Sequence, residues 1–312
     1  MDQAEGLRTL MRENSGTSGS ALAPLESQRD PRHTSCPRVL SITSGKGGVG
    51  KTNVVVNLAF AFTQLGKRVL VLDADLGLAN IDVLLGLTPQ YNIEHLFHGE
   101  KRFSEILVKG PGGMSIIPAS SGVLDLVNLD ESQKLFLLNE IDLLNENFDL
   151  LLIDTGAGIS SNVLYFNMAA QESIVIATPE PTSLTDAYAL IKVLSTKFNK
   201  KEFLILVNWV GNGKEAEEVF RKISRVADRY LKSLSIDYLG FIPFDEKIPL
   251  AVKHQRPVLE HYPKAPSSRS FVELAKALWE RPIRNNEKGT IQFFLKELLL
   301  CDHLVDQKGG TD

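Results

Sequence analysis

The sequence is constrained first by a glycine-rich segment, GKGGVGKT, that runs from Gly45 to Thr52. Its spacing satisfies the G-x-x-x-x-G-K-[ST] pattern, in which glycines let consecutive backbone N–H groups turn toward the phosphates of a nucleoside triphosphate. Lys51 adds positive charge beside these phosphates, and the Thr52 hydroxyl is a candidate ligand for Mg²⁺. The flanks agree, because residues 39–42 are predicted to form a strand and residues 53–65 a helix. The segment therefore predicts a site for a triphosphate and magnesium.

A second lysine, Lys46, stands at the front of this loop. A loop that binds one triphosphate can carry two lysines if one of them reaches a nucleotide that is bound by another subunit. No second GKT-type loop occurs in the chain, so a second nucleotide must come from another copy. We therefore predict a homodimer in which Lys46 and Lys51 both have catalytic roles. The residues predicted to contact the nucleotide are Gly45, Lys46, Gly47, Gly48, Val49, Gly50, Lys51 and Thr52.

Apolar runs alternate with amphipathic segments from Arg38 onward. Near-continuous runs of Val, Ile and Leu are typical of strands that are buried on both faces, and alternating strands and helices are typical of α/β folds. We predict one doubly wound domain over residues 38–283, with a mainly parallel sheet and helices on both faces. The predicted strands are Val39–Ile42, Val69–Leu72, Ser115–Ile117, Leu150–Ile153, Ile174–Ala177, Phe203–Val207 and Tyr238–Ile242.

Three aspartates stand where strands of this sheet are predicted to end. Asp73 and Asp75 follow the strand at 69–72, and Asp154 follows the strand at 150–153. Ligands of open α/β sheets bind beyond the carboxyl ends of the strands, so these carboxylates are expected near the glycine-rich loop. We predict that Asp75 orients or activates the attacking water, that Asp73 holds Mg²⁺ through a water, and that Asp154 completes the magnesium shell. Aspartates that only form turns are the alternative for the first two.

The segment Thr155–Ser161 is predicted to be a switch. Gly156 and Gly158 allow its backbone to approach the γ-phosphate and to respond when that phosphate is lost. Two residues at other strand ends are candidates for contacts with the base: we predict that the Asn208 amide reads the adenine edge and that Pro243 flanks the ring. Ordinary turn residues are the alternative for both.

Composition excludes several classes of protein. The net charge of −4 argues against direct, mainly electrostatic binding to DNA. Only Cys36 and Cys301 are present, so one chain encodes neither a disulfide scaffold nor a zinc or iron–sulfur site. No apolar run approaches the ~20 residues needed to cross a bilayer, and the N-terminus lacks a signal-peptide core. We expect a cytoplasmic protein that is neither exported nor integral.

The N-terminal residues differ from the central domain. Residues 1–13 are predicted to contain a short amphipathic helix, which Asp2 can cap. Residues 14–37 are rich in Ser, Gly, Pro and Thr, which is typical of a flexible linker. A helix on a tether usually meets a partner; a frayed end without function is the alternative.

The C-terminal tail, residues 284–312, contains an amphipathic segment at about 290–305. This segment is predicted either to lie on a membrane or to dock on the domain or on a partner subunit. Basic residues just before it suit anionic headgroups, while its own acidic residues weaken that attraction. The residues predicted to enter the membrane are Ile291, Phe294, Leu295 and Leu298.

The segments KGGVGKT, LDADLGLANID and LIDTGAG together resemble the motifs of the deviant Walker-A ATPases of the MinD/ParA group, over most of the predicted domain. This resemblance implies binding of ATP and ADP with Mg²⁺, and ATP-dependent sandwich dimers in which Lys46 reaches the partner's phosphates. It also places Lys51 and Thr52 on the phosphate and magnesium positions, Asp75 on the hydrolytic position and Asp154 on the Walker-B position.

The segment DQAEGLR is similar to the DQAxxLR motif of the FlhG family (also FleN or YlxH), which are MinD-like ATPases that control bacterial flagellar number and placement. The matching residues are Asp2, Gln3, Ala4, Leu7 and Arg8. In that family this helix stimulates the signal-recognition-type GTPase FlhF, so the resemblance implies a FlhF-type partner with Gln3 as the key group. It also implies a membrane-targeting C-terminal helix, and thus reversible association with the inner membrane surface, with a location at the cell pole as a further expectation.

These features predict a regulatory ATPase switch. Two subunits close on ATP, present two tails to the membrane and separate after hydrolysis. A flagellar transcription activator and flagellar switch proteins are further expected partners. The alternative is a ParA-type DNA partition ATPase or another MinD-like positioning ATPase, and salt-dependent binding to duplex DNA would favour the former. A protein that acts chiefly as an interaction platform, with slow hydrolysis as a timer, is a third interpretation.

Overall fold

The computed structural model describes residues 37–75, 80–118, 147–231 and 234–282. The predicted N-terminal helix, nearly all of the linker and the C-terminal tail lie outside these residues, so what the sequence predicts for them stays a prediction. Within the described ranges, no helix is long and apolar enough to cross a membrane.

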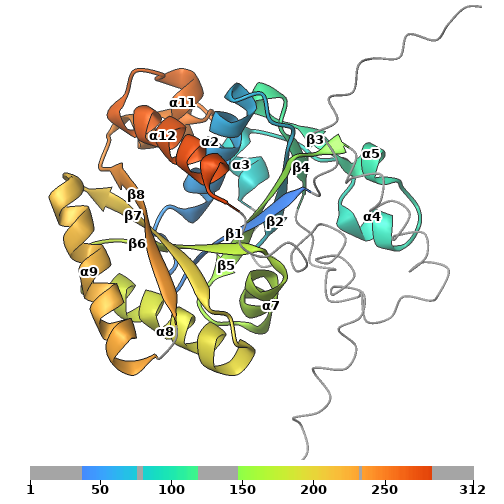
Figure 1. The fold of residues 1–312 in the computed structure, drawn as a ribbon. Helices are drawn as coiled ribbons and strands as arrows, with labels where there is room; N and C mark the ends of the chain where they lie inside the picture. Colours follow the sequence, from blue (N-terminus) through green and yellow to red (C-terminus); the bar gives the residue numbers. More distant parts are fainter. Residues whose placement is uncertain (1–36, 76–79, 119–146, 232–233, 283–312) are drawn as a thin grey trace, which may run out of the picture. The chain divides into compact units, whose positions relative to one another are not determined.

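A single sheet organises the described residues (Figure 1). Its strands are β1 (Arg38–Ser44), β2 (Val69–Ala74), β3 (Val108–Lys109), β4 (Ser115–Ile117), β5 (Leu150–Ala157), β6 (Glu172–Ala177), β7 (Glu202–Val210) and β8 (Ser235–Pro243). They follow the order β3-β4-β2-β5-β1-β6-β7-β8, and each neighbouring pair is parallel except β3 with β4. The seven predicted strands and the mainly parallel sheet are confirmed. The strand that the pattern does not predict is β3, whose two residues are too few to show a period.

Helices cover both faces of this sheet, as a doubly wound fold requires. The helices are α2 (Lys51–Gln64), α3 (Ile81–Leu85), α4 (Ile93–Phe97), α5 (Phe103–Ile106), α7 (Ser161–Ala169), α8 (Pro181–Phe198), α9 (Gly213–Tyr230), α10 (Lys247–Lys253), α11 (Val258–His261) and α12 (Pro266–Glu280), with a 3₁₀ turn η1 (Pro111–Gly113). Helices α2, α11 and α12 pack on one face, and α7, α8 and α9 pack on the other (Figure 1). The helix predicted after the glycine-rich loop is α2, which begins two residues earlier than expected.

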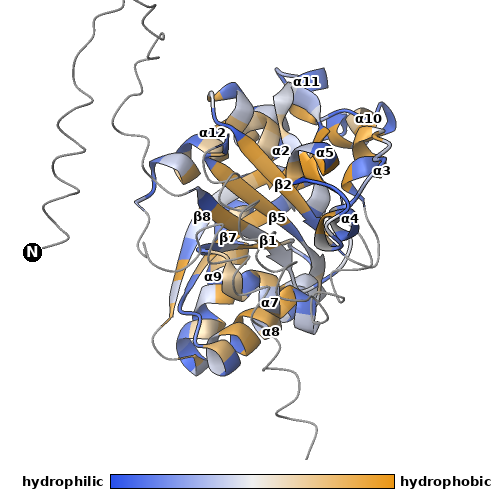
Figure 2. Ribbon diagram, turned by 90° about the vertical axis from the view of Figure 1, so that its right-hand side faces the viewer, coloured by the Kyte–Doolittle hydropathy of each residue, from blue (hydrophilic) through white to orange (hydrophobic). Residues whose placement is uncertain are grey.

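Alternate side chains of the central strands point to opposite faces, and both sets are buried. Leu40 and Ile42 of β1 join the core beneath α2, whereas Val39 joins the core on the other face. Ile174 and Val175 of β6 divide in the same way. Figure 2 shows hydrophobic colours along central strands such as β2 and more hydrophilic colours on outer surfaces of the helices. Burial on both faces explains the near-continuous apolar runs of the sequence.

The first strand and the last helix meet at the amino-terminal edge of the sheet. Arg38, at the start of β1, is buried, and its Nε lies 2.7 Å from Oε2 of Glu172 at the start of β6. Its guanidinium also donates to the backbone carbonyl of Leu278, in the last turn of α12. The chain therefore enters the sheet beside the place where it leaves α12.

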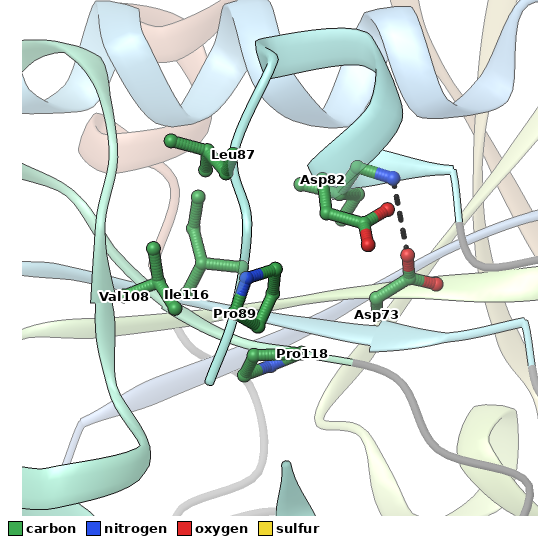
Figure 3. A pocket seen from close by; sticks show the side chains of 8 residues that line it. Asp73, Asp82, Leu87, Pro89, Val108, Ile116 and Pro118 are labelled. Atoms are coloured by element: carbon green, nitrogen blue, oxygen red, sulfur yellow. Dashed lines mark hydrogen bonds between the residues drawn. The ribbon is translucent and has the colours of Figure 1, made fainter. Parts of the chain in front are cut away.

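Asp73, near the end of β2, is hydrogen-bonded to the backbone at the start of α3. Its carboxylate accepts hydrogen bonds from the backbone N–H groups of Asp75, Asn80 and Ile81, at 3.2, 3.0 and 3.1 Å. The last two donors stand at the start of α3, which no side chain of its own caps. Figure 3 shows this carboxylate below α3, beside a narrow crevice that Asp82 also lines. Asp73 thus fixes where α3 begins.

The pKa of Asp73 is raised to about 6. Burial is the main cause, and the negative charge of Asp154 adds to it, while the three backbone hydrogen bonds act in the opposite direction. Folding therefore favours the protonated form of this carboxyl.

We predict that Asp73→Asn weakens the pH dependence of stability. Because the pKa is higher in the folded chain than in the unfolded chain, ionisation of Asp73 favours unfolding. The wild type should lose stability relative to the variant as the pH rises from about 4 to about 6, by a difference of ~2 kcal/mol. Urea unfolding of both chains between about pH 4 and pH 7 measures this difference, and parallel stability profiles would contradict it.

Candidate nucleotide-binding site

The glycine-rich loop lies at the centre of the carboxyl edge of the sheet. It connects the end of β1 to the start of α2, and β1 lies between β5 and β6. Helix α2 begins after Gly50 with no side-chain hydrogen bond to cap it and no acidic residue in its first turn. The uncapped N–H groups and the helix dipole favour an anion at this end, so the local structure suits a phosphate group.

Two glycines of the loop are required by close packing. A Cβ on Gly45 would lie 2.1 Å from the backbone carbonyl oxygen of Asp186 in α8. A Cβ on Gly50 would lie 2.6 Å from Nδ2 of Asn208, and Gly50 also has a φ of 86°. The loop is therefore held between α8 and the end of β7, and a side chain at either position would displace its backbone.

The centre of the site is a buried ion pair. Nζ of Lys51 lies 2.8 Å from Oδ1 of Asp154, and the two side chains are 8% and 1% exposed. Oδ2 of the same carboxylate has no hydrogen-bond partner among the described residues. Burial raises the pKa of Asp154, and the positive charge of Lys51 opposes this rise. A buried carboxylate with one oxygen without a partner fits a Mg²⁺ ligand, because this ion prefers oxygen ligands.

Neighbouring strands bring the three predicted aspartates together. Asp73 of β2 is in register with Asp154 of β5. Asp75 lies one step further along, where a Cβ built on Gly156 would be 3.4 Å from its Oδ1. The charge of Asp75 contributes to the raised pKa of Asp154, whereas Thr52 acts on the same carboxyl in the opposite direction. These four polar side chains are therefore neighbours near the carboxyl ends of β2 and β5 and the start of α2.

The described residues do not form a metal site from protein side chains alone. Within the described ranges, no group of three or more His, Cys, Asp or Glu side chains is placed to hold a metal ion. Mg²⁺ in triphosphate sites takes phosphate oxygens and waters together with one or two protein ligands. Thr52 and Asp154 are sufficient for a site of this kind.

The predicted switch segment is hydrogen-bonded to the end of β1, just before the glycine-rich loop. The N–H of Gly158 donates to the carbonyl of Ser44 at 2.9 Å, and the Thr155 hydroxyl donates to the carbonyl of Ile42 at 3.2 Å. The first three residues of the segment belong to β5, and Ser160 caps α7. A movement at the end of β1 can therefore pass through two hydrogen bonds to the segment that leads into α7.

Lys46 contacts its own chain in this structure. Its Nζ pairs with the carboxylate of Glu180 and donates to the Thr182 hydroxyl at 3.0 Å. Lys46 is 37% exposed and Glu180 is 54% exposed, so the pair lies open to solvent. The sequence pattern does not single out these two partners, although both follow β6 at the edge of the sheet where the predicted aspartates also stand.

Asn208 holds the loop directly. Its buried side chain donates from Nδ2 to the carbonyl of Val49 at 2.8 Å, and its Oδ1 accepts from the N–H of Trp209 at 3.0 Å. These contacts give Asn208 a part in positioning the loop, in addition to the contact with adenine that we predict. Pro243 ends β8, where it is in register with Val210 of β7.

Trp209 is a further residue of this site that the sequence pattern does not single out. Its φ of 62° lies in the left-handed region, which bulky residues rarely adopt. The side chain is 43% exposed, and its ring would lie 3.8 Å from a Cβ on Gly50. Strained residues of this kind concentrate at functional sites. Its place directly after Asn208, at the end of β7, is the signal that could have identified it.

Comparisons with known proteins agree with this geometry. A profile of the CobQ/CobB/MinD/ParA nucleotide binding domain matches residues 40–258. The antiactivator FleN of Pseudomonas aeruginosa is 43% identical over 262 residues, which cover 84% of this chain and 93% of FleN. The flagellum site-determining protein YlxH of Helicobacter pylori is 34% identical over 84% of this chain and 90% of YlxH.

Solved structures agree on the fold as well. A chain of the MinC:MinD cell division protein complex of Aquifex aeolicus superimposes with a TM-score of 0.61 and 28% identity, over 81% of this chain and 100% of that chain. The sequence match, the sheet order and the buried Lys51–Asp154 pair beside the glycine-rich loop point to one conclusion. The chain belongs to the CobQ/CobB/MinD/ParA family, as an ATPase of the MinD/ParA type.

Proposed function

We propose that this ATPase is a regulatory switch for flagellar number or placement, which alternates between a monomer and a membrane-associated dimer. The relatives FleN and YlxH support the flagellar part, because one is an antiactivator and the other a flagellum site-determining protein. The observation that carries the switch is the buried contact between Lys51 and Asp154. It holds a phosphate-binding cation and a magnesium-binding carboxylate together until a ligand separates them.

ATP is proposed to change the partner of Lys51. In the structure the ammonium group neutralises Asp154. In the complex Lys51 turns to the phosphate oxygens, and the N–H groups at the start of α2 donate to them. Asp154 and the Thr52 hydroxyl then hold Mg²⁺ directly or through water, with Asp73 contributing through a water. Magnesium at this position neutralises charge that develops on the phosphates.

Asp75 is proposed to orient or activate the attacking water. It follows β2, and its carboxylate faces the start of the switch segment at Gly156. The N–H of Gly158 in the switch segment donates to the carbonyl of Ser44, which ends β1 directly before the glycine-rich loop. Loss of the γ-phosphate can therefore release the segment and α7 together.

Lys46 is proposed to act in trans. Its contacts with Glu180 and Thr182 lie at the surface, where an ion pair contributes only about 0–1 kcal/mol to stability. Lys46 can therefore leave them at little cost and reach the phosphates of a nucleotide bound to a second copy. ATP thereby links two subunits, and hydrolysis separates them.

The two tails are proposed to carry the outputs. The segment DQAEGLR, with Gln3 as its key group, stimulates a FlhF-type GTPase, and the C-terminal segment around Phe294 binds the inner membrane surface. FleN is an antiactivator, which supports the proposal that this chain also restrains a flagellar transcription activator. Flagellar switch proteins are further proposed partners.

We predict that Lys46→Ala abolishes ATP-driven dimerisation and lowers ATPase activity at least about tenfold, because the cation that bridges the subunits is lost. Analytical ultracentrifugation with a non-hydrolysable ATP analogue measures the dimer. Glu180→Gln is the matched control, since it frees Lys46 without removing it and should still dimerise. A normal dimer of Lys46→Ala would rule out the role of Lys46 in trans.

We predict that Asp75→Ala binds ATP and dimerises but hydrolyses ATP about 10²–10⁴-fold more slowly, because the group that orients the water is lost. Phosphate release measures hydrolysis, and nucleotide binding is measured on the same samples. Hydrolysis at the wild-type rate would remove Asp75 from the mechanism.

We predict that ATP increases binding to liposomes and that a chain stopped at Glu287 loses this increase. One amphipathic tail binds weakly, whereas the dimer presents two tails whose affinities combine. Co-sedimentation with ATP, with ADP and without nucleotide compares the intact and shortened chains. Equal binding of the intact chain under all three conditions would refute the nucleotide switch.

A further inference from the structure

A cavity of about 640 Å³ lies at the amino-terminal edge of the sheet, at the opposite ends of the strands from the glycine-rich loop. It adjoins the starts of β2 and β4 and the residues just before β5. Its volume is in the range of small-molecule sites, which is about 300–1,000 Å³. No step of the proposed ATPase mechanism uses it.

The lining of this cavity is basic. Among the described residues it includes Lys67, Arg68, Arg102 and Lys109 and no acidic residue, although the whole chain has a net charge of −4. Nearby carboxylates compensate part of this charge, because Asp149 pairs with Arg68 at 2.8 Å and lies next to the cavity.

Both lysines of this lining are without a carboxylate partner among the described residues. Nζ of Lys67 lies 4.0 Å from the centre of the Trp279 ring, and Nζ of Lys109 donates to the Ser115 hydroxyl at 2.8 Å. Arg102, which directly precedes α5, also lines the cavity, and its charge acts on Glu105. The rim therefore offers ammonium groups that an anion can bind without displacing an existing ion pair.

The interior of the cavity is less polar than its rim. Val69, Phe103 and Phe148 are buried and line it, while Arg68 and Lys109 are exposed. Cations above an apolar floor suit a ligand with a negative group on an apolar body. A phosphate ester of a lipid has this chemistry.

The cavity adjoins the place where the chain leaves the domain. Lys67 contacts Trp279, and Arg38 donates to Leu278, both in the last turn of α12. The described residues end at 282, and the predicted membrane segment begins at about 290. Eight residues span at most ~26–29 Å, so a tail bound to a bilayer holds this edge close to the headgroups.

We propose that this cavity binds the headgroup phosphate of an anionic phospholipid, with Lys67 and Lys109 donating to the phosphate oxygens. The inference rests on the membrane association of the proposed function and names a second contact with the same bilayer. The tail supplies apolar insertion, and the cavity supplies selectivity for anionic lipid and fixes which edge of the domain faces the membrane.

The test uses the full-length chain with ATP and compares Lys67→Gln/Lys109→Gln with Lys192→Gln/Lys197→Gln. The second pair removes the same charge from exposed positions on α8. Co-sedimentation is measured with vesicles of phosphatidylcholine alone and with vesicles that also contain phosphatidylglycerol. The cavity variant should bind the anionic vesicles roughly tenfold or more weakly than the wild type, and bind the neutral vesicles equally. The α8 variant should resemble the wild type, and Lys67→Arg/Lys109→Arg should restore binding if the fold is intact.

Three outcomes would overturn the proposal. One is equal binding of the cavity variant and the wild type to anionic vesicles, which would leave the cavity for an acidic peptide of a partner. Another is an equal loss in the α8 variant, which would show general electrostatic attraction. A third is full competition by millimolar glycerol phosphate in solution with no preference for vesicles, which would identify a soluble phosphate ester as the ligand. Loss of the ATP dependence alone would instead count against the proposed switch.

Discussion

The buried pair of Lys51 and Asp154 is the interaction on which the site depends. A carboxylate that is 1% exposed is costly in its ionised form, and Lys51 offsets this cost across 2.8 Å. The pair also holds the start of α2 against the end of β5, which sets the distance between the phosphate-binding loop and the Walker-B strand. Since one carboxylate oxygen has no partner among the described residues, the pair is only partly satisfied. A divalent cation can bind this carboxylate oxygen.

The parallel sheet makes the rest of the site possible, and this part can be predicted from sequence. Runs of Val, Ile and Leu locate the strands, and parallel strands bring their carboxyl ends to one edge. Asp73 and Asp154 occupy matching positions after such runs, and the structure places them in register on neighbouring strands. The local sequence pattern is sufficient here because each aspartate is placed by its own strand. All the parallel strands also bring their carboxyl ends to the same edge of the sheet.

Contacts between distant segments could not be predicted in this way. Lys46 and Glu180 are 134 positions apart, and Asn208 and Val49 are 159 apart, so no local period links them. The close packing of Gly45 could not be predicted from a local pattern either. Its pattern marks it as a loop glycine, but the reason for its small size is the backbone of Asp186 in α8. Close approaches of this kind depend on how the helices pack on the sheet. That packing is determined by the whole core and not by a local sequence pattern.

The contact of Arg38 with Leu278 has a consequence for the architecture of signalling. It places the first and last elements of the domain at the same edge of the sheet. If the two predicted tails bind as proposed, the domain would keep their binding partners close to each other. A linker over residues 14–37 has a root-mean-square reach of roughly 25–29 Å as a flexible chain. Under the proposed function, a GTPase bound by the predicted N-terminal helix would stay within this distance of the sheet edge that the predicted C-terminal segment holds near the bilayer. The GTPase would then search for membrane targets along a surface and not through a volume. Its rate of encounter with these targets would rise without any direct contact between them and this chain.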